Sequence, residues 1–433
     1  MLRMNFLPDQ PVLALHDDAL KADQFAEQLY GAVTGAQPPF VFGVLGDWGT
    51  GKTSVLRLLE ARLNADDICI PIWFDAWRYE NETNILYPLL HAIQQCHQRI
   101  APHKSERFAT AFFDTVVTSA VVLTDLGLRS ATKVLTGDAY SLTNVADWLK
   151  KLREQRKSLT ELLSTWTTEV EHLHTAFAEM LAAFAADVRP NDPDTVRFVI
   201  LIDDLDRCLP DTTIKLLESI KNHLDAPNVV FVLALNAAVV YQGIQHKYGA
   251  VNVSGREYLE KILNYTFYVP EPEIDSLRDF AKARWTSILP ERADREHLQS
   301  ELDEFGRVLA QCRFSNPRKI KRILNRYVLF LSRHTELKKF RLDSVIRLLV
   351  LAEYFPDVFQ FVRDFIEQKG ARDPFEPQKF YTFYHARTGT HLFSLYPQLA
   401  IMSALFELRE TSNIHDHTLR QHTAEVYQIT RLI

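Results

Sequence analysis

The segment from Gly46 to Thr53 contains residue types that can hold a chain of phosphates. Its sequence, GDWGTGKT, matches the pattern G-x-x-x-x-G-K-S/T in full. Glycine lets the backbone turn tightly enough for several N–H groups to converge on one ligand, and Lys52 adds an ammonium group that neutralises phosphate oxygens. The Thr53 hydroxyl is the expected ligand of Mg²⁺. We therefore expect this loop to bind ATP or GTP with Mg²⁺, through Gly46, Asp47, Trp48, Gly49, Thr50, Gly51, Lys52, Thr53 and Ser54.

Two consecutive carboxylates, Asp203 and Asp204, supply the second half of such a site. They follow an apolar run at 198–202, which places them at the carboxyl end of a buried strand, where open α/β sheets bind ligands. We expect Asp203 to hold Mg²⁺ through water and Asp204 to orient or deprotonate the attacking water in a hydrolysis reaction. Asp206 fits an acidic turn that caps the next helix at least as well as it fits catalysis. The prediction requires Lys52 and Asp203 to face one common space that admits a triphosphate.

Asn236 is a further candidate, because it follows the apolar run at 228–235. This position suits a residue that senses the γ-phosphate or the attacking water. A helix N-cap explains Asn236 equally well.

Arginines supply candidates for a catalytic or sensing role. In NPRKIKRILNRY, Arg318, Arg322 and Arg326 lie four residues apart on one face of a predicted helix. Arg318 is the best candidate to reach the phosphates as a catalytic arginine, and a solvated basic face is an equal alternative. Arg256 is a weaker candidate for the same role. A nucleic-acid patch has little support, because no aromatic stacking platform accompanies these arginines.

These residues need a scaffold that brings the ends of strands together, and the hydrophobic pattern predicts one. Short apolar runs at 40–46, 69–77, 196–206 and 228–236 are typical of buried strands, and helical patterns at 52–63 and 85–100 alternate with them. The predicted fold class is α/β, with a doubly wound, mainly parallel P-loop NTPase sheet. A long helical insertion and an α-helical C-terminal region complete the prediction.

Residues 101–195 separate the second and third strands and are far more than one crossover helix requires. From Leu149 to Phe184 apolar residues recur at alternating steps of three and four, broken only at Arg156, which predicts a coiled-coil-like helix packed on another helix. Its partner is either 106–136 of the same chain or another subunit or protein. The apolar stretch 108–124 is interrupted by Asp114 and by hydroxyl groups, so we expect a buried or partner-facing helix and no membrane crossing.

The chain is too long for one ordinary core, with 433 residues. We expect an N-terminal segment of the NTPase domain at 1–37, an NTPase core at 38–100 and 196–270, the insertion at 101–195, a helical lid at 271–335 and a C-terminal helical region at 336–433. A net charge of −6 gives no sign of a nucleic-acid or membrane surface. Four scattered cysteines and an N-terminus without a signal-like apolar core predict a cytoplasmic protein.

Together, these segments resemble the KAP family of P-loop NTPases. The likeness rests on GDWGTGKTS, WFDAWRYE (73–80), IDDLDRC (202–208), EYLEKI (257–262) and NPRKIKRILN (316–325). It implies an additional-strand ATPase core of the STAND branch, and hence ATP as the nucleotide. The roles of Lys52, Thr53, Asp203 and Asp204 carry over to the matching positions. Family members often carry transmembrane helices in the ATPase domain, but here the region 106–136 is interrupted by polar residues.

The resemblance implies a nucleotide-driven assembly or signalling switch, of the kind found in bacterial phage defence. Our first hypothesis is an ATPase whose hydrolysis drives or times self-association or assembly with a protein partner, through the insertion or the C-terminal region. The second is an ATP-loaded scaffold that cleaves its nucleotide rarely. A third is an ATPase stimulated by nucleic acid, which predicts a steep dependence of turnover on salt.

Overall fold

The fold comes from a computed structural model, in which the chain forms two compact units. One unit comprises residues 11–15 and 22–269, and the other comprises 1–10, 16–21 and 270–433. The structure describes residues 6–12, 18, 20–82, 84–102, 105–123, 166–248, 254–288, 316–333 and 342–369, together with Ile429 and single residues between 303 and 309.

The first unit is built on a parallel sheet of five strands in the order β2-β3-β4-β1-β5. The strands are β1 (Phe40–Leu45), β2 (Cys69–Asp75), β3 (Arg197–Asp203), β4 (Val229–Leu235) and β5 (Tyr265–Tyr268). Because every pair is parallel, all carboxyl ends lie at one edge of the sheet. The predicted α/β fold is confirmed. β4 separates β1 from β3, which is the additional-strand arrangement that the family resemblance implies.

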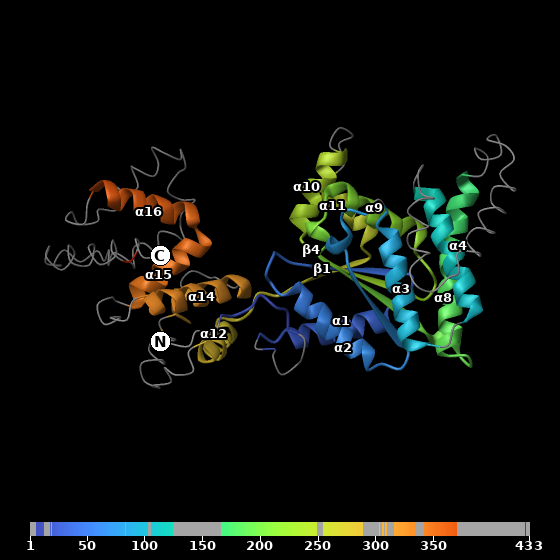
Figure 1. Cartoon of the computed structure of the whole chain (residues 1–433), viewed down its shortest axis with the longest axis horizontal. Coiled ribbons are helices and arrows are strands. Elements are labelled where there is room, and N and C mark those ends of the chain that lie inside the picture. Colours follow the sequence, from blue (N-terminus) through green and yellow to red (C-terminus); the bar gives the residue numbers. More distant parts are fainter. Residues whose placement is uncertain are drawn as a thin grey trace. The chain divides into compact units, whose positions relative to one another are not determined.

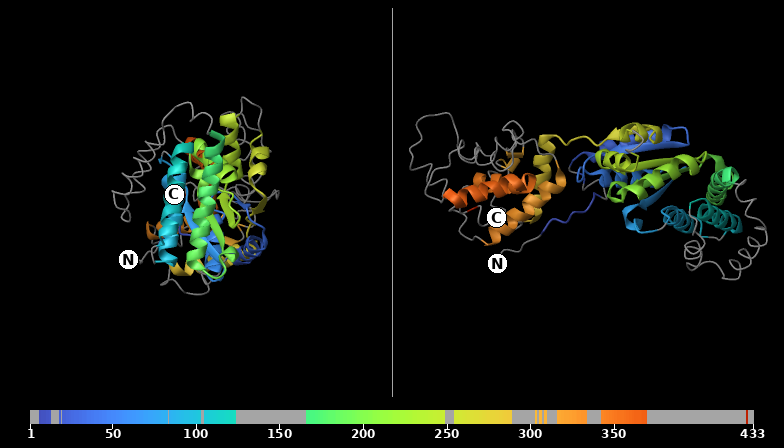
Figure 2. Two further views of the ribbon diagram at one scale, coloured as in Figure 1. Left: turned by 90° about the vertical axis from the view of Figure 1, so that its right-hand side faces the viewer. Right: turned by 90° about the horizontal axis from the view of Figure 1, so that it is seen from above.

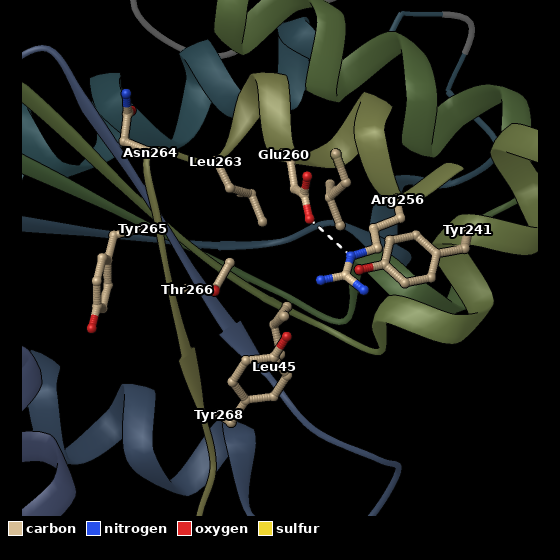
Figure 3. Close-up of a pocket in the computed structure, with 10 residues that line it drawn as sticks. Leu45, Tyr241, Arg256, Glu260, Leu263, Asn264, Tyr265, Thr266 and Tyr268 are labelled. Atoms are coloured by element: carbon tan, nitrogen blue, oxygen red, sulfur yellow. Dashed lines mark hydrogen bonds and ion pairs between the residues drawn. The ribbon is translucent and has the colours of Figure 1, made fainter. Parts of the chain in front are cut away.

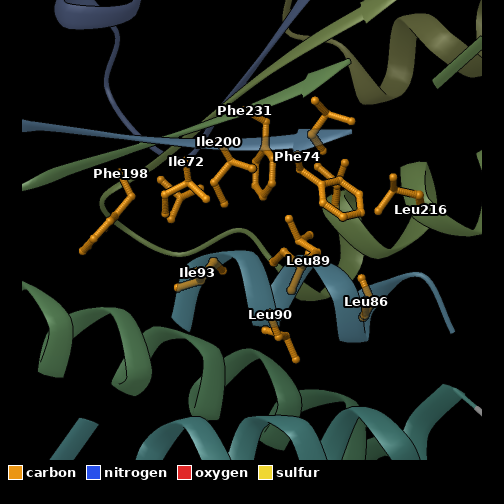
Figure 4. Packing of buried hydrophobic residues seen from close by; sticks show 14 of the residues in the cluster. Ile72, Phe74, Leu86, Leu89, Leu90, Ile93, Phe198, Ile200, Leu216 and Phe231 are labelled. Carbon is orange, nitrogen blue, oxygen red and sulfur yellow. The ribbon is translucent and has the colours of Figure 1, made fainter. Parts of the chain in front are cut away.

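The strands β1 to β4 are buried on both faces, which explains their continuous apolar sequences. Along β3, Phe198, Ile200 and Ile202 pack into one hydrophobic cluster, and Val199 and Leu201 pack into the cluster on the opposite face. Figure 4 shows the first of these clusters between the sheet and a covering helix. This burial holds the ends of β1, β3 and β4 in fixed positions.

Helices cover both faces of the sheet (Figure 1). The face that carries Val199 and Leu201 is covered by α1 (Ala22–Gly35) and α2 (Lys52–Asn64). The face that carries Phe198 and Ile200 is covered by α3 (Leu86–Ile100), α9 (Pro210–His223), α10 (Ala237–Tyr248) and α11 (Gly255–Ile262). Short 3₁₀ turns at Trp77–Tyr79 and Leu205–Arg207 follow β2 and β3. The segments that follow the strands at the carboxyl edge are therefore α2, α10 and these turns.

Two helices of the insertion, α4 (Glu106–Leu123) and α8 (Trp166–Val188), lie side by side (Figure 2). On α8, the described part of the heptad seam is buried at Leu173, Phe177, Met180 and Phe184. The Thr115 hydroxyl of α4 donates a hydrogen bond of 3.0 Å to the carbonyl of Ala176. This part of the seam thus packs within the chain, while residues 149–165 of the predicted helix lie outside the described residues. Of the helices that the structure describes, none has the length and apolar character of a membrane span.

The second unit is helical where it is described. It contains α12 (Ile274–Ile288), α14 (Pro317–Arg333), α15 (Leu342–Tyr354) and α16 (Pro356–Lys369). α14 contacts both α12 and α15. The N-terminal residues 6–10 belong to this unit, because the side chain of Asn325 exchanges two hydrogen bonds, of 2.8 and 2.9 Å, with the backbone of Leu7.

Candidate nucleotide-binding site

The loop after β1 has the backbone that a phosphate-binding loop needs. Gly49 and Gly51 have φ angles of 86° and 101°, in the left-handed region that a side chain disfavours. Gly51 directly precedes the first turn of α2, so the free N–H groups of that helix start at Lys52. The arrangement joins a turn of the chain to the positive end of a helix. It can bind an anion without further side chains.

Lys52 lies inside this loop, with a relative exposure of 8%. Its ammonium group donates hydrogen bonds to the carbonyl oxygens of Gly46, at 2.8 Å, and Asp47, at 3.2 Å. The same nitrogen lies 3.5 Å from Oδ2 of Asp206. A buried cation held by backbone carbonyls and one carboxylate is available to phosphate oxygens that enter the loop.

The other polar residues of the loop have internal contacts. The Thr50 hydroxyl donates to the carbonyl of Asp47 at 2.8 Å. The Ser54 hydroxyl accepts a hydrogen bond of 3.0 Å from the backbone N–H of Val12, so it fixes the N-terminal segment of this unit. Trp48 is 52% exposed, although it belongs to the loop.

Asp203 ends β3 and is almost fully buried, with an exposure of 3%. Its carboxylate interacts with the Thr53 side chain, so the two predicted metal ligands lie together. Burial raises the pKa of Asp203 above its ordinary value, against the interaction with Thr53 and the charge of Lys52. Asp203 thus interacts with both Thr53 and Lys52, and the roles of these residues in binding nucleotide and metal stay a prediction.

The donors at this point fit a magnesium ion. Oδ1 of Asp203 is buried and has no hydrogen-bond partner among the described residues. Mg²⁺ prefers oxygen ligands and binds through one or two carboxylates together with phosphates and water. Within the described ranges, no cluster of three or more His, Cys, Asp or Glu side chains offers an alternative metal site. Thr53 and Asp203 are therefore the residues that would hold the ion.

Asp204 directly follows the strand and has the left-handed backbone conformation, with φ 55°. Its carboxylate lies 2.9 Å from the guanidinium group of Arg207. Burial and the neighbouring charge of Asp203 raise the pKa of Asp204 to about 6, and Arg207 opposes this shift. A carboxylate that titrates near neutrality suits a general base.

Asp206 is a residue that sequence reasoning did not include among the site residues. It is 4% exposed, and its Oδ2 atom accepts hydrogen bonds from the backbone N–H of Asn236, at 2.7 Å, and from the Trp48 indole, at 3.1 Å. Together with Lys52, it joins the loop after β1 to the end of β4. The only signal in the sequence was a third aspartate in IDDLD, which an acidic turn explained equally well.

Asn236 is the N-cap of α10, and its role as a sensor of the γ-phosphate or of the attacking water stays a prediction. Its Oδ1 atom accepts from the backbone N–H groups of Ala238, at 3.0 Å, and Val239, at 3.4 Å, which is an N-cap of α10. Its Nδ2 atom donates to Oδ1 of Asp47 at 3.2 Å. Asn236 is therefore a helix cap that also contacts the phosphate-binding loop.

Arg256 lies on α11, where its Nε atom donates to Glu260 at 2.9 Å. It lines a pocket of about 270 Å³ between α10, α11, β1 and β5, together with Tyr241 and Tyr268 (Figure 3). The structure thus places Arg256 on α11 and at this pocket, and its role at the phosphates remains a prediction.

Arg318 belongs to the second unit. Its Nε atom lies 2.6 Å from Oδ2 of Asp9, and Asn316 caps the first turn of its helix by accepting from the backbone N–H of Arg318 at 3.1 Å. Its proposed role as a nucleotide sensor also remains a prediction.

A parallel sheet whose first strand leads through a glycine-rich loop into a helix, with acidic residues at the end of β3, defines a P-loop NTPase. Residues 22–332 match the KAP family P-loop domain, and the chain belongs to this family. The chain is similar to the phage T7 exclusion protein of Escherichia coli (strain K12), with 22% identity over 304 residues. The similarity covers 66% of this chain and 38% of that protein, so the chain spans well under half of its relative.

Solved structures of the ORC2 and ORC1 proteins of Aeropyrum pernix are also similar. The ADP form of the ORC2 protein has 12% identity to this chain and a TM-score of 0.36. The match covers 98% of this chain and 96% of the ORC2 chain. The ORC1 protein in complex with DNA has 14% identity to this chain and a TM-score of 0.28. The match covers 98% of this chain and 86% of the ORC1 chain.

Proposed function

We propose that this protein is a Mg²⁺-dependent ATPase that acts as a nucleotide-driven switch for assembly or signalling in bacterial phage defence. One observation carries the proposal of ATP hydrolysis: Asp203, buried and with an unpartnered carboxylate oxygen within the described region, interacts with Thr53 and Lys52. The role in defence rests on the similarity to a protein named for exclusion of phage T7.

Each residue of the site has a distinct proposed task. Lys52 and the N–H groups at the start of α2 bind the phosphates and neutralise charge that develops on them. Thr53 and Asp203 would hold Mg²⁺, which would supply positive charge that stabilises the phosphates. Asp204 first separates from Arg207 and then accepts a proton from the attacking water. Asn236 keeps the loop and the start of α10 in register through its contact with Asp47.

Steady-state ATP hydrolysis by an Asp204→Asn variant tests the proposed base. Loss of a general base lowers turnover by roughly 10²–10⁴-fold, and the affinity for ATP should remain close to that of the original protein. Asp211→Asn, an equal charge change on the exposed first turn of α9, is the matched control. Unaltered turnover in Asp204→Asn would assign the base elsewhere.

A second candidate function is a scaffold that loads ATP and cleaves it rarely. The ion pair of 2.9 Å between Asp204 and Arg207 favours it, because a paired carboxylate is a poorer proton acceptor. Tight retention of ATP with turnover close to zero would support this candidate. In either case, the mass of the particle with and without a slowly hydrolysed ATP analogue tests whether the nucleotide drives self-association.

A further inference from the structure

Asp206 accepts more contacts than an acidic turn residue requires. A single atom, Oδ2, accepts from the Asn236 backbone at 2.7 Å and from the Trp48 indole at 3.1 Å, and lies 3.5 Å from the Lys52 ammonium. These partners come from the end of β4, the phosphate-binding loop and the first turn of α2. A 3₁₀ turn at Leu205–Arg207 fixes the backbone of Asp206 directly after β3.

The buried position of the Asp206 carboxylate is energetically unfavourable, so its presence there calls for a functional explanation. The side chain of Asp206 is 1% exposed, and its second oxygen, Oδ1, has no hydrogen-bond partner in the part of the chain that the structure covers. A buried carboxylate oxygen without a partner loses its hydration and destabilises the fold. Lys52 offsets part of this unfavourable energy, so each group stabilises the charge of the other.

Phosphates and Asp206 are alternative partners of the same ammonium group. Lys52 already donates to the carbonyls of Gly46 and Asp47, so an incoming phosphate replaces one of its present contacts. The contact with Asp206 is the longest of the three, at 3.5 Å, and it is the only one of these contacts that carries a negative charge. It is also the contact that a phosphate oxygen replaces most directly, because both are anions.

We propose that Asp206 competes with the nucleotide phosphates for Lys52. When the nucleotide binds, Asp206 is released from Lys52, and this change is transmitted to Trp48 and to the start of α10. This inference rests on the proposed binding of ATP at the loop. Asp206 is a positioning residue in this scheme, because it acts through Lys52 and not on the phosphates. After Lys52 turns to the phosphates, Asp206 keeps its bonds to Trp48 and Asn236 and carries an uncompensated charge beside them.

The test uses the full-length protein with Asp206→Asn, which removes the charge and keeps an amide oxygen that can accept from Trp48 and Asn236. ADP with Mg²⁺ is the probe, and its dissociation constant is measured by calorimetry. We expect binding to become about 10-fold tighter, because a charged contact that opposes the phosphate is lost. Turnover at saturating ATP should change less than the affinity does. Asp211→Asn is the control, and it should leave the affinity unchanged.

A second readout separates competition for Lys52 from simple repulsion between Asp206 and phosphate. The emission of Trp48, obtained as the difference from a Trp48→Phe background, should change when ADP binds, and this change should be lost in Asp206→Asn. Unchanged or weaker ADP affinity in Asp206→Asn would overturn the inference and leave the proposed function intact. Tighter binding with an undiminished Trp48 response would also overturn it. Absence of ADP and ATP binding to the original protein would instead contradict the proposed function itself.

Discussion

Charged residues gather in two regions of this chain, the carboxyl edge of the sheet and the basic face of α14, and their partners differ in kind. On α14, Arg318 pairs with Asp9, while Arg322 and Arg326 each lie 3.3 Å from the carboxylate of Glu353. Lys321 donates to the carbonyl of Gln10 at 3.1 Å. At the sheet edge, by contrast, the acidic groups are buried and two of their oxygens are unpartnered among the residues described.

The contrast between the two regions indicates which charged residues are candidates for binding a ligand. Opposite charges that satisfy one another within a unit explain their own presence, and most such exposed pairs contribute little to stability. Buried carboxylates with unpartnered oxygens destabilise the fold, so their retention calls for a function. By this criterion we propose that Asp203 and Asp206 belong to a site, whereas ion pairs within the unit account for the arginines of α14.

The largest expected effect comes from Lys52→Ala, which tests the sheet edge directly. Affinity for ATP should fall by about 100-fold or more, because charge-assisted contacts with the phosphates of roughly 1.5–3 kcal/mol each are lost. Calorimetric titration with ATP and Mg²⁺ measures this change. Lys321→Ala is the matched control, since that lysine also donates to backbone carbonyls. Micromolar ATP affinity retained in Lys52→Ala would remove the assignment of the site.

Asp203→Asn should have the next largest effect and acts on the metal. Turnover at a given Mg²⁺ concentration should fall by roughly 100-fold, because a metal ion contributes several kcal/mol to the stabilisation of the transition state. A titration of ATPase activity with Mg²⁺ shows whether more metal restores part of the rate. Asp192→Asn, in an exposed loop, should leave the titration unchanged. An identical Mg²⁺ dependence in Asp203→Asn would mean that the ion binds elsewhere.

The smallest effect is expected on α14, from Glu353→Gln. Its side chain is 5% exposed, but the arginines that it pairs with are 62% and 47% exposed, so solvent screens both contacts. We expect a loss of about 1 kcal/mol in the free energy of unfolding and no change in nucleotide affinity. Urea denaturation measures the first quantity. Arg322→Ala should destabilise less, because Glu353 keeps Arg326; a loss of ATP affinity in either variant would contradict the structural role of this pair.

The sequence predicted the parts of the fold that long, continuous patterns encode. The strands β1 to β4 are apolar because both of their faces are buried, and the helix expected after the glycine-rich loop does begin at Lys52. β5 was missed, since it has only four residues and none of them is buried. Its place beside β1 depends on pairing between distant segments, which no local pattern reveals.

The contacts within the candidate site were predictable only in part. The residue types and spacing identified the loop and Asp203, because phosphate binding needs those residues at those positions. The direction of the Asp206 side chain was not predictable, since it depends on a 3₁₀ turn after β3 and on the neighbouring position of β4. The pairing of Asp204 with Arg207 depends in the same way on a left-handed residue that is not glycine.

The central position of β4 has a mechanical consequence. All seven of its residues are buried, and it is bonded to β1 on one side and β3 on the other. A strand that is buried and paired on both sides is rigid, so we expect any movement on nucleotide exchange to occur in the turns and helix starts that follow the strands. Variants such as Val232→Ala should therefore loosen the whole unit without altering which nucleotide it prefers.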